Sequence, residues 1–107
     1  MRRLTEDAFI AIMAANLTAA KRAGQLADWA QPAIVARHMF AQYMAAFLAW
    51  AAGDLDIASF RAAALSGLCH LLAGVARGPF AVEVEARIRE IPEWSTKEVP
   101  DAAASRD

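Results

Sequence analysis

Two neighbouring stretches of the chain contain no charged residue, one from His38 to Gly53 and the other from Ala62 to Ala76. Neither stretch alternates between apolar and polar positions as a half-buried strand does. As helices, both carry apolar side chains around most of their circumference, which is more than a chain of 107 residues can cover by itself. The pattern therefore predicts a partner, and we expect a second copy because twofold dimers are the commonest soluble assemblies.

Four helices are predicted from capping residues, helix stops and apolar spacing. The first begins at the N-cap Thr5, ahead of the acidic residues Glu6 and Asp7, and ends at Gly24 after a basic last turn. The other three helices are expected at Pro32 to Ala52, Asp56 to Arg77 and Phe80 to Ile91.

The lengths of the connections predict how these helices are arranged. The loop between the second and third helices is only a few residues long, so the two should form an antiparallel hairpin. The expected fold is all-α, with residues 1–91 as one domain that dimerises as an intermolecular four-helix bundle. Residues 92–107 are predicted to be a flexible polar tail, with Trp94 as its anchor.

Composition supports helices and argues against direct binding to nucleic acid. Apolar residues make up 58% of the chain, above the usual range of about 45–50%, and much of the excess is alanine, which favours helix. The net charge of −1 provides no cluster of Lys and Arg to displace counterions from phosphates. We therefore expect no contact between this chain and DNA or RNA.

Neither uncharged stretch is predicted to cross a membrane. The 16 residues of the first would span about 24 Å as a helix, whereas the hydrocarbon layer is about 30 Å thick. The lone cysteine, Cys69, has no partner for an internal disulfide, and the chain shows no secretory leader. A cytoplasmic location is expected.

Five short motifs follow one another between Ala8 and Ile91. They are a helix end of the form A-x-x-x-G-x-L, a polar linker with a proline, an alanine-containing helix entry, a tryptophan followed by G-x-L-D, and a leucine pair with a glycine. Their residues are Ala20, Gly24 and Leu26; Asp28 and Pro32; Val35 and Ala36; Trp50, Gly53, Leu55 and Asp56; and Leu71, Leu72 and Gly74. In this order the motifs resemble the C-terminal regulatory half of tetracycline-repressor-type (TetR) transcription factors.

The resemblance implies a regulatory domain that binds an effector and forms a homodimer. In such repressors the two long helices pair with their copies as a four-helix interface. Nothing in this sequence resembles the family's DNA-binding helix-turn-helix, so the DNA-reading part is expected to be absent from this chain. The alternative is an adaptor that uses the same apolar hairpin to dock on another regulator.

The candidate site residues lie on the two long helices. A small apolar effector is expected to contact the histidines, the polar residues Gln42 and Tyr43, and nearby large side chains, because apolar pockets with few polar anchors hold small molecules. These ligand-binding candidates are His38, Met39, Gln42, Tyr43, Phe47, Trp50 and His70. The dimer interface is predicted to contain Phe40, Met44, Phe47, Leu48, Ala63, Gly67, Leu68, Leu71 and Gly74.

No catalytic machinery is visible in the sequence. Cys69 and His70 are neighbours, but adjacent helical residues point about 100° apart and cannot share a metal ion or act as nucleophile and base. The motifs G-x-S-x-G and H-E-x-x-H do not occur. We therefore expect neither an enzyme nor a bound metal or cofactor.

The polar residues of the two long helices have other expected roles. A histidine in a dimer interface is a candidate for a switch near neutral pH, and Gln42 and Tyr43 are expected to be buried and hydrogen-bonded.

Overall fold

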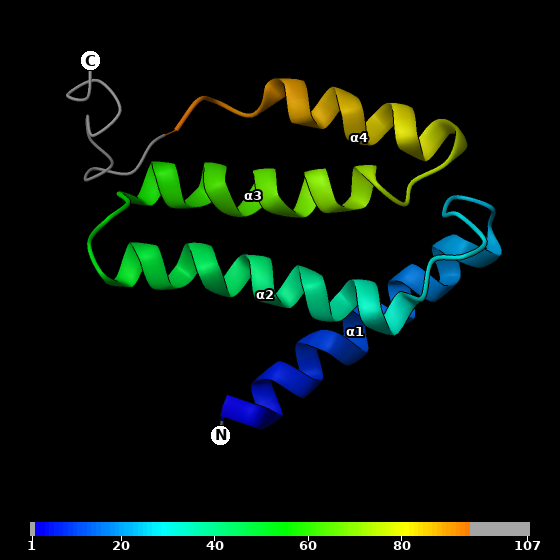
Figure 1. Ribbon diagram of the computed structural model, residues 1–107, viewed down its shortest axis with the longest axis horizontal. Helices are drawn as coiled ribbons and strands as arrows, with labels where there is room; N and C mark the ends of the chain where they lie inside the picture. The colour runs from blue at the N-terminus through cyan, green and yellow to red at the C-terminus, as the bar shows by residue number, and fades with distance from the viewer. Residues whose placement is uncertain (1, 95–107) are drawn as a thin grey trace, which may run out of the picture.

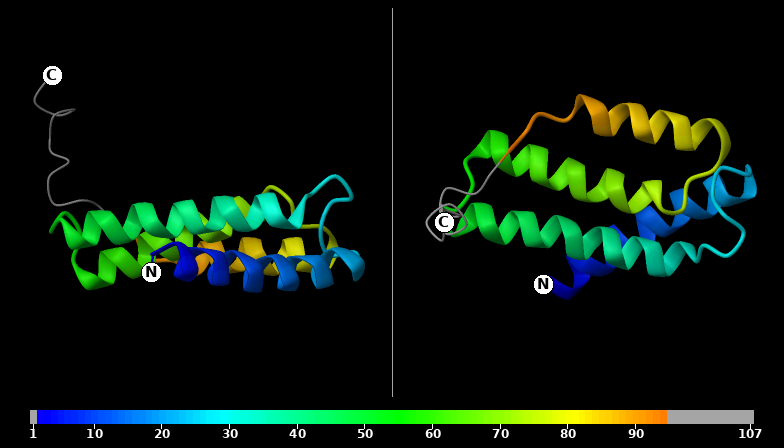
Figure 2. Two further views of the ribbon diagram at one scale, coloured as in Figure 1. Left: turned by 90° about the horizontal axis from the view of Figure 1, so that it is seen from below. Right: turned by 45° about the horizontal axis from the view of Figure 1, so that its top comes forward.

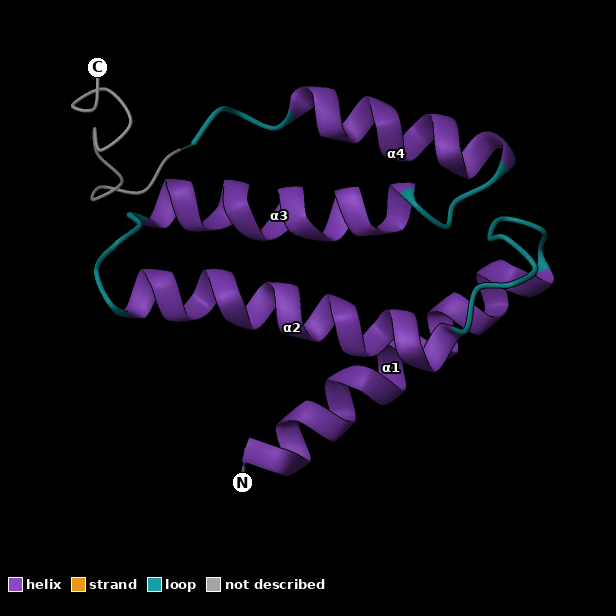
Figure 3. Ribbon diagram, in the orientation of Figure 1, coloured by secondary structure: helices purple, strands orange, loops and turns teal. Residues whose placement is uncertain are grey.

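The computed structural model describes residues 2–94, and this part of the chain contains four helices and no strand (Figures 1 and 3). They are α1 (Arg2–Arg22), α2 (Pro32–Ala51), α3 (Ile57–Ala73) and α4 (Gly78–Glu90). The predicted all-α fold is confirmed. Residues 95–107, which make up most of the predicted tail, lie outside the described residues.

The helices α2, α3 and α4 lie side by side, each antiparallel to the one before it (Figure 1). The helix α1 crosses α2 obliquely on one side of this layer, and the views in Figure 2 show that the other side carries no helix. We call this uncovered side, which is turned toward the viewer in Figure 1, the front face. The hairpin expected from the short loop is therefore present, but α1 covers only one of its two sides.

The N-terminal ends of the helices follow the predicted signals at two of four places. Pro32 occupies the first turn of α2, and the Asp56 carboxylate caps α3 by accepting a hydrogen bond of 2.7 Å from the Ser59 backbone N–H. Thr5 is not an N-cap, because α1 already begins at Arg2 and arginine and leucine favour helix. The start of α4 lies at Gly78, two residues before Phe80.

The third helix ends four residues earlier than predicted. Residues 24–31 and 74–77 form a short antiparallel bridge between Leu26 and Ala76. In this bridge the Ala27 N–H donates to the Val75 carbonyl oxygen and the Arg77 N–H to the Gln25 carbonyl oxygen, each at 2.8 Å. Because a loop distant in sequence takes up these groups, the helix stops at Ala73.

The main core lies at the bridged end of the molecule. Its buried members come from α1, α2, the segment after α3 and residues 23–31 between α1 and α2, which we call the connector. They are Leu17, Leu26, Ala30, Val35, Ala36, Met39 and Val75. A second cluster joins α3 to α4 through Cys69, Ala76 and Val84. No helix within residues 2–94 has the length and hydropathy required to span a bilayer.

Candidate functional site

The front face contains a groove along the seam between α2 and α3, formed by two hollows. The larger has a volume of about 370 Å³ and is lined by Gln42, Ala45, Ala46, Ala49, Leu55, Ala63, Ser66, Gly67, His70 and Trp94. The smaller has a volume of about 270 Å³ and is lined by Trp29, Ala30, Gln31, Ile34, Val35, His38, Leu71 and Val75. We call them the Trp94 hollow and the His38 hollow, and together the front groove.

Charge and side-chain size distinguish the front groove from the rest of the surface. Within the part of the chain that the structure describes, neither hollow is lined by Asp, Glu, Lys or Arg. Most of the wall of the Trp94 hollow consists of alanine, glycine and serine. Small residues at the seam of a helix pair leave room for another helix to approach closely. The walls of the Trp94 hollow are therefore free of Asp, Glu, Lys and Arg in the described residues and made mostly of small side chains.

Gly67 lets the Gln42 side chain lie across α3. A Cβ atom at Gly67 would lie 3.0 Å from Gln42 Oε1 and 3.5 Å from Gln42 Cβ, which is closer than an ordinary contact to the oxygen. Gln42 is exposed, so its amide faces both the groove and water. The expectation that Gln42 is buried is wrong, because its position on α2 points toward the front groove and not toward α1.

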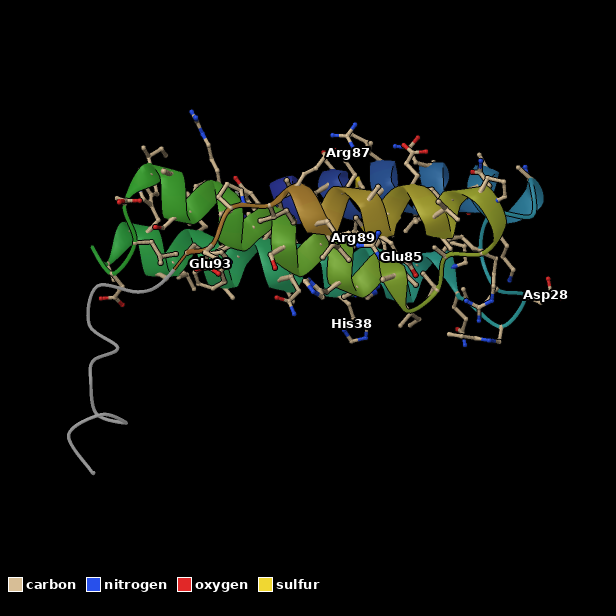
Figure 4. All side chains as sticks on the ribbon, turned by 90° about the horizontal axis from the view of Figure 1, so that it is seen from above. Asp28, His38, Glu85, Arg87, Arg89 and Glu93 are labelled. Atoms are coloured by element: carbon tan, nitrogen blue, oxygen red, sulfur yellow. The ribbon has the colours of Figure 1, made fainter. Side chains whose placement is uncertain are left out.

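The two histidines are exposed on the front face, one on each helix of the hairpin. His38 projects from α2 on the side away from α1 (Figure 4). The His70 ring folds back along α3, where its Nδ1 donates a hydrogen bond of 2.8 Å to the Ser66 carbonyl oxygen. That bond leaves Nε2 of His70 directed to solvent or to a partner.

The side of α2 nearest α1 carries a row of aromatic rings. Phe9 and Phe40 have centroids 5.3 Å apart, Tyr43 and Phe60 lie 5.9 Å apart, and Trp50 lies 5.6 Å from Phe60. These rings are only partly buried, so the predicted burial of Tyr43 is wrong as well. Edge and offset contacts between rings stabilise such a row without a fully enclosed core.

A third hollow lies between α1 and α2. Its volume is about 660 Å³, and its walls are Glu6, Ile10, Arg37, Phe40, Ala41, Met44, Phe47 and Leu48. The walls are mainly apolar, with one carboxylate and one guanidinium among them. We call this the α1–α2 hollow, and its size is within the range of small-molecule sites.

The structure does not bring the seven ligand-binding candidates into one pocket. Three line the front groove, namely His38, Gln42 and His70. Tyr43, Phe47 and Trp50 belong to the aromatic row, and Met39 is buried in the main core. Six of the seven candidates are spread around α2 and cannot all face one cavity, and the sequence does not show which side of α2 is covered by α1.

The predicted interface residues also divide between two sides. Ala63, Gly67 and Leu71 line the front groove, and Gly74 is exposed at the end of α3. Phe40, Met44, Phe47 and Leu48 line the α1–α2 hollow instead. Leu68 packs against the main core of its own chain. Only the first group lies on the uncovered side of the hairpin.

Sequence reasoning missed the contacts that hold the connector in place. Lys21 Nζ donates a hydrogen bond of 2.8 Å to the Ala30 carbonyl oxygen, and the Arg77 guanidinium lies 5.7 Å from the centroid of the Trp29 ring. Neither pair has a recognisable spacing in the sequence, because each joins segments that only the fold brings together. These contacts position Trp29 at the edge of the His38 hollow.

Cys69 and His70 face different surroundings. The Cys69 thiol is buried between α3 and α4, and burial raises its pKa, while the positive charge of Arg87 acts in the opposite direction. A thiol with a raised pKa is a weak nucleophile at neutral pH. Among residues 2–94, no three His, Cys, Asp or Glu side chains lie close enough together to hold a metal ion.

Comparison of the chain with protein-family models, with curated proteins and with solved structures gave no match. A functional assignment must therefore come from the residues of this chain and their arrangement.

Proposed function

We propose that this chain is a regulatory domain that works as a homodimer, with the front groove of one copy facing that of the other. The observation that carries the proposal is the front groove itself, an uncovered seam between two long helices with uncharged walls in the described part of the chain. A surface of this kind is unfavourable in water and favourable against another apolar surface.

A second copy is a suitable partner because the groove is compatible with itself. In a twofold dimer the same patch meets on both sides, so any charge on it would face a like charge. Uncharged walls avoid that repulsion. The small side chains along α2 and α3 allow helix axes to approach to about 8–10 Å, and two antiparallel hairpins then form a four-helix bundle.

The size of the front face suits a stable dimer. The helices α2 and α3 have 20 and 17 residues, which correspond to lengths of about 30 and 25 Å. A stable interface buries about 800 Å² on each partner and has an apolar centre. A face two helices wide and of this length supplies an area of that order.

The regulatory part of the proposal is supported by the motif order and by the α1–α2 hollow. The motifs resemble the C-terminal half of TetR-type regulators, a resemblance that implies an effector-binding domain and, in full-length relatives, coupling of effector binding to release of DNA. The α1–α2 hollow offers about 660 Å³ of mainly apolar space beside the helix that would form the interface. A small apolar effector bound there would act on the dimer through α2 if it preferred one of two arrangements of α1.

The test places one charge on the front face and one elsewhere. Ala45 lines the Trp94 hollow, and Ala86 is exposed on α4 away from the groove. Glutamate is a good helix former, so Ala45→Glu and Ala86→Glu should both fold. Two facing carboxylates in an apolar interface cost several kcal/mol, so Ala45→Glu should weaken dimerisation about 100-fold or more.

Light scattering with circular dichroism gives the readout. At about 100 µM we expect the mass of the native chain and of Ala86→Glu to approach twice the 11.5 kDa of one chain, and Ala45→Glu to be a folded monomer. A folded Ala45→Glu dimer would place the interface elsewhere. A native chain that stays monomeric but binds a different regulator in equal amounts would favour the adaptor.

A further inference from the structure

After α4 the chain does not continue along the layer but crosses to the front face. The segment from Ile91 to Trp94, which we call the strap, leaves the end of α4 and turns toward the side on which His38 lies (Figures 2 and 4). Ile91 packs against the second core cluster, so the strap is fixed at its start. Its last residue, Trp94, then forms one wall of the Trp94 hollow.

Trp94 differs in size from the other walls of that hollow. The other walls are mainly small residues of α2 and α3, among them Ala45, Ala49 and Gly67. The indole is 42% exposed, compared with 64% for Trp29 in the connector, so more than half of its surface is covered. A large side chain therefore borders the part of the seam where side chains are smallest.

We propose that the strap regulates self-association, because Trp94 occupies the place that a helix of the second copy must enter. This inference rests on the proposed dimer across the front groove. Helices that approach to about 8–10 Å need small residues between them, and the indole of Trp94, which lines the same hollow as Ala45 and Gly67, hinders that approach. The dimer therefore forms only when Trp94 moves away from the seam between α2 and α3.

The strap and a second copy compete for the seam between α2 and α3, and the strap has an advantage because it belongs to the same chain. A tethered group has an effective concentration in the millimolar range, whereas a second copy competes at its actual concentration. Dimerisation is thus weaker than the apolar area alone suggests. An interaction that holds Trp94 away from the seam therefore increases the affinity of the two copies for each other. By linkage, dimerisation increases the affinity for that interaction by the same factor.

Sedimentation equilibrium of strap variants measures this competition. In Trp94→Ala the competitor is lost, and we expect the dimer dissociation constant to fall about tenfold or more, which corresponds to about 1.4 kcal/mol for each factor of ten. Trp94→Phe retains an aromatic ring, so its dimer dissociation constant should lie between those of Trp94→Ala and the native chain. Val82→Ala, at an exposed position of α4, is the control and should leave the constant unchanged.

Fluorescence of Trp94 gives a second readout that does not require a dissociation constant. In a chain with Trp29→Phe and Trp50→Phe, the remaining indole should be protected from acrylamide at submicromolar concentration. Its quenching should increase as the dimer forms at higher concentration. Quenching equal to that of free indole at every concentration would contradict the proposed role of the strap.

The outcomes separate the strap from the dimer. If the native chain and Trp94→Ala dimerise with the same constant, or if Trp94→Ala dimerises more weakly, the strap does not compete and the dimer itself stands. If both chains remain monomeric at about 100 µM, the proposed dimer fails, and the inference about the strap fails with it.

Discussion

The buried thiol of Cys69 makes the free energy of unfolding depend on pH. Burial between α3 and α4 favours the neutral thiol and raises its pKa above that of the unfolded chain. Below the usual thiol pKa of about 8.5 the thiol is neutral in both states, and its contribution to the free energy of unfolding is fully present. As the pH rises further, the unfolded chain loses its proton first, and this contribution is lost as the pH passes through the folded pKa.

We therefore expect the free energy of unfolding to fall more steeply with pH above the usual thiol pKa of about 8.5 in the native chain than in Cys69→Ala. Urea unfolding followed by circular dichroism measures both chains. Other groups titrate equally in the two, so the difference isolates the thiol. Parallel curves would show that Cys69 ionises as easily in the folded chain as in the unfolded one.

The residue types of the sequence predicted that the front groove lacks charged side chains among the described residues, but they did not predict which of its candidate residues are buried. The lack of charged residues from His38 to Gly53 and from Ala62 to Ala76 agrees with the walls of the front groove, which contain no Asp, Glu, Lys or Arg in the described part of the chain. The orientation of Gln42 and Tyr43 was not predictable, because a helix that is apolar on most sides gives no signal for which side faces α1. Gln42 is in fact exposed beside Gly67, and Tyr43 is half-buried in the aromatic row.

At the scale of elements, local signals predicted the ends of helices only where local residues decide them. Pro32 and Asp56 act within their own turns, and both predictions are confirmed. The end of α3 depends instead on the bridge between Leu26 and Ala76, which joins segments 50 residues apart. No local pattern encodes such a pairing, so the predicted end at Arg77 was wrong.

The bridge also makes a prediction about coupled stability. Leu26 is buried, and Leu26→Ala should cost about 2–5 kcal/mol because it leaves a cavity at the bridged end. Since the connector and the segment after α3 hold each other, the Arg77 amide should lose protection from hydrogen exchange together with the Ala27 amide.

Hydrogen exchange followed by NMR checks this coupling. Leu48→Ala is the matched control, because Leu48 is 61% exposed on α2 and should change neither amide. Loss of protection at Ala27 with Arg77 unaffected would show that the two segments open independently. In that case the early end of α3 would need another cause.

At the scale of the whole molecule, the sequence predicted four helices and an antiparallel hairpin, both of which are confirmed. It did not predict that α1 crosses on one side and leaves the other side open. A connector of nine residues is compatible with either side, and the choice depends on packing around Ala36 and Leu17, which have no distinctive pattern. The role of Trp94 depends on that choice.

The proposed function depends on self-association through the front groove. A chain with this apolar surface should be unable to remain single at high concentration, even with Trp94 over part of the seam. The open side of α2 and α3 offers no other cover among residues 2–94. Dimerisation of the native chain therefore decides whether the groove is an interface.

Sedimentation equilibrium of the native chain from about 1 to about 100 µM tests this claim most directly. We predict a mass that rises from 11.5 kDa toward twice that value, fitted by a single monomer–dimer constant. A folded chain that keeps the mass of one molecule over the whole range, with and without Trp94, would contradict the account.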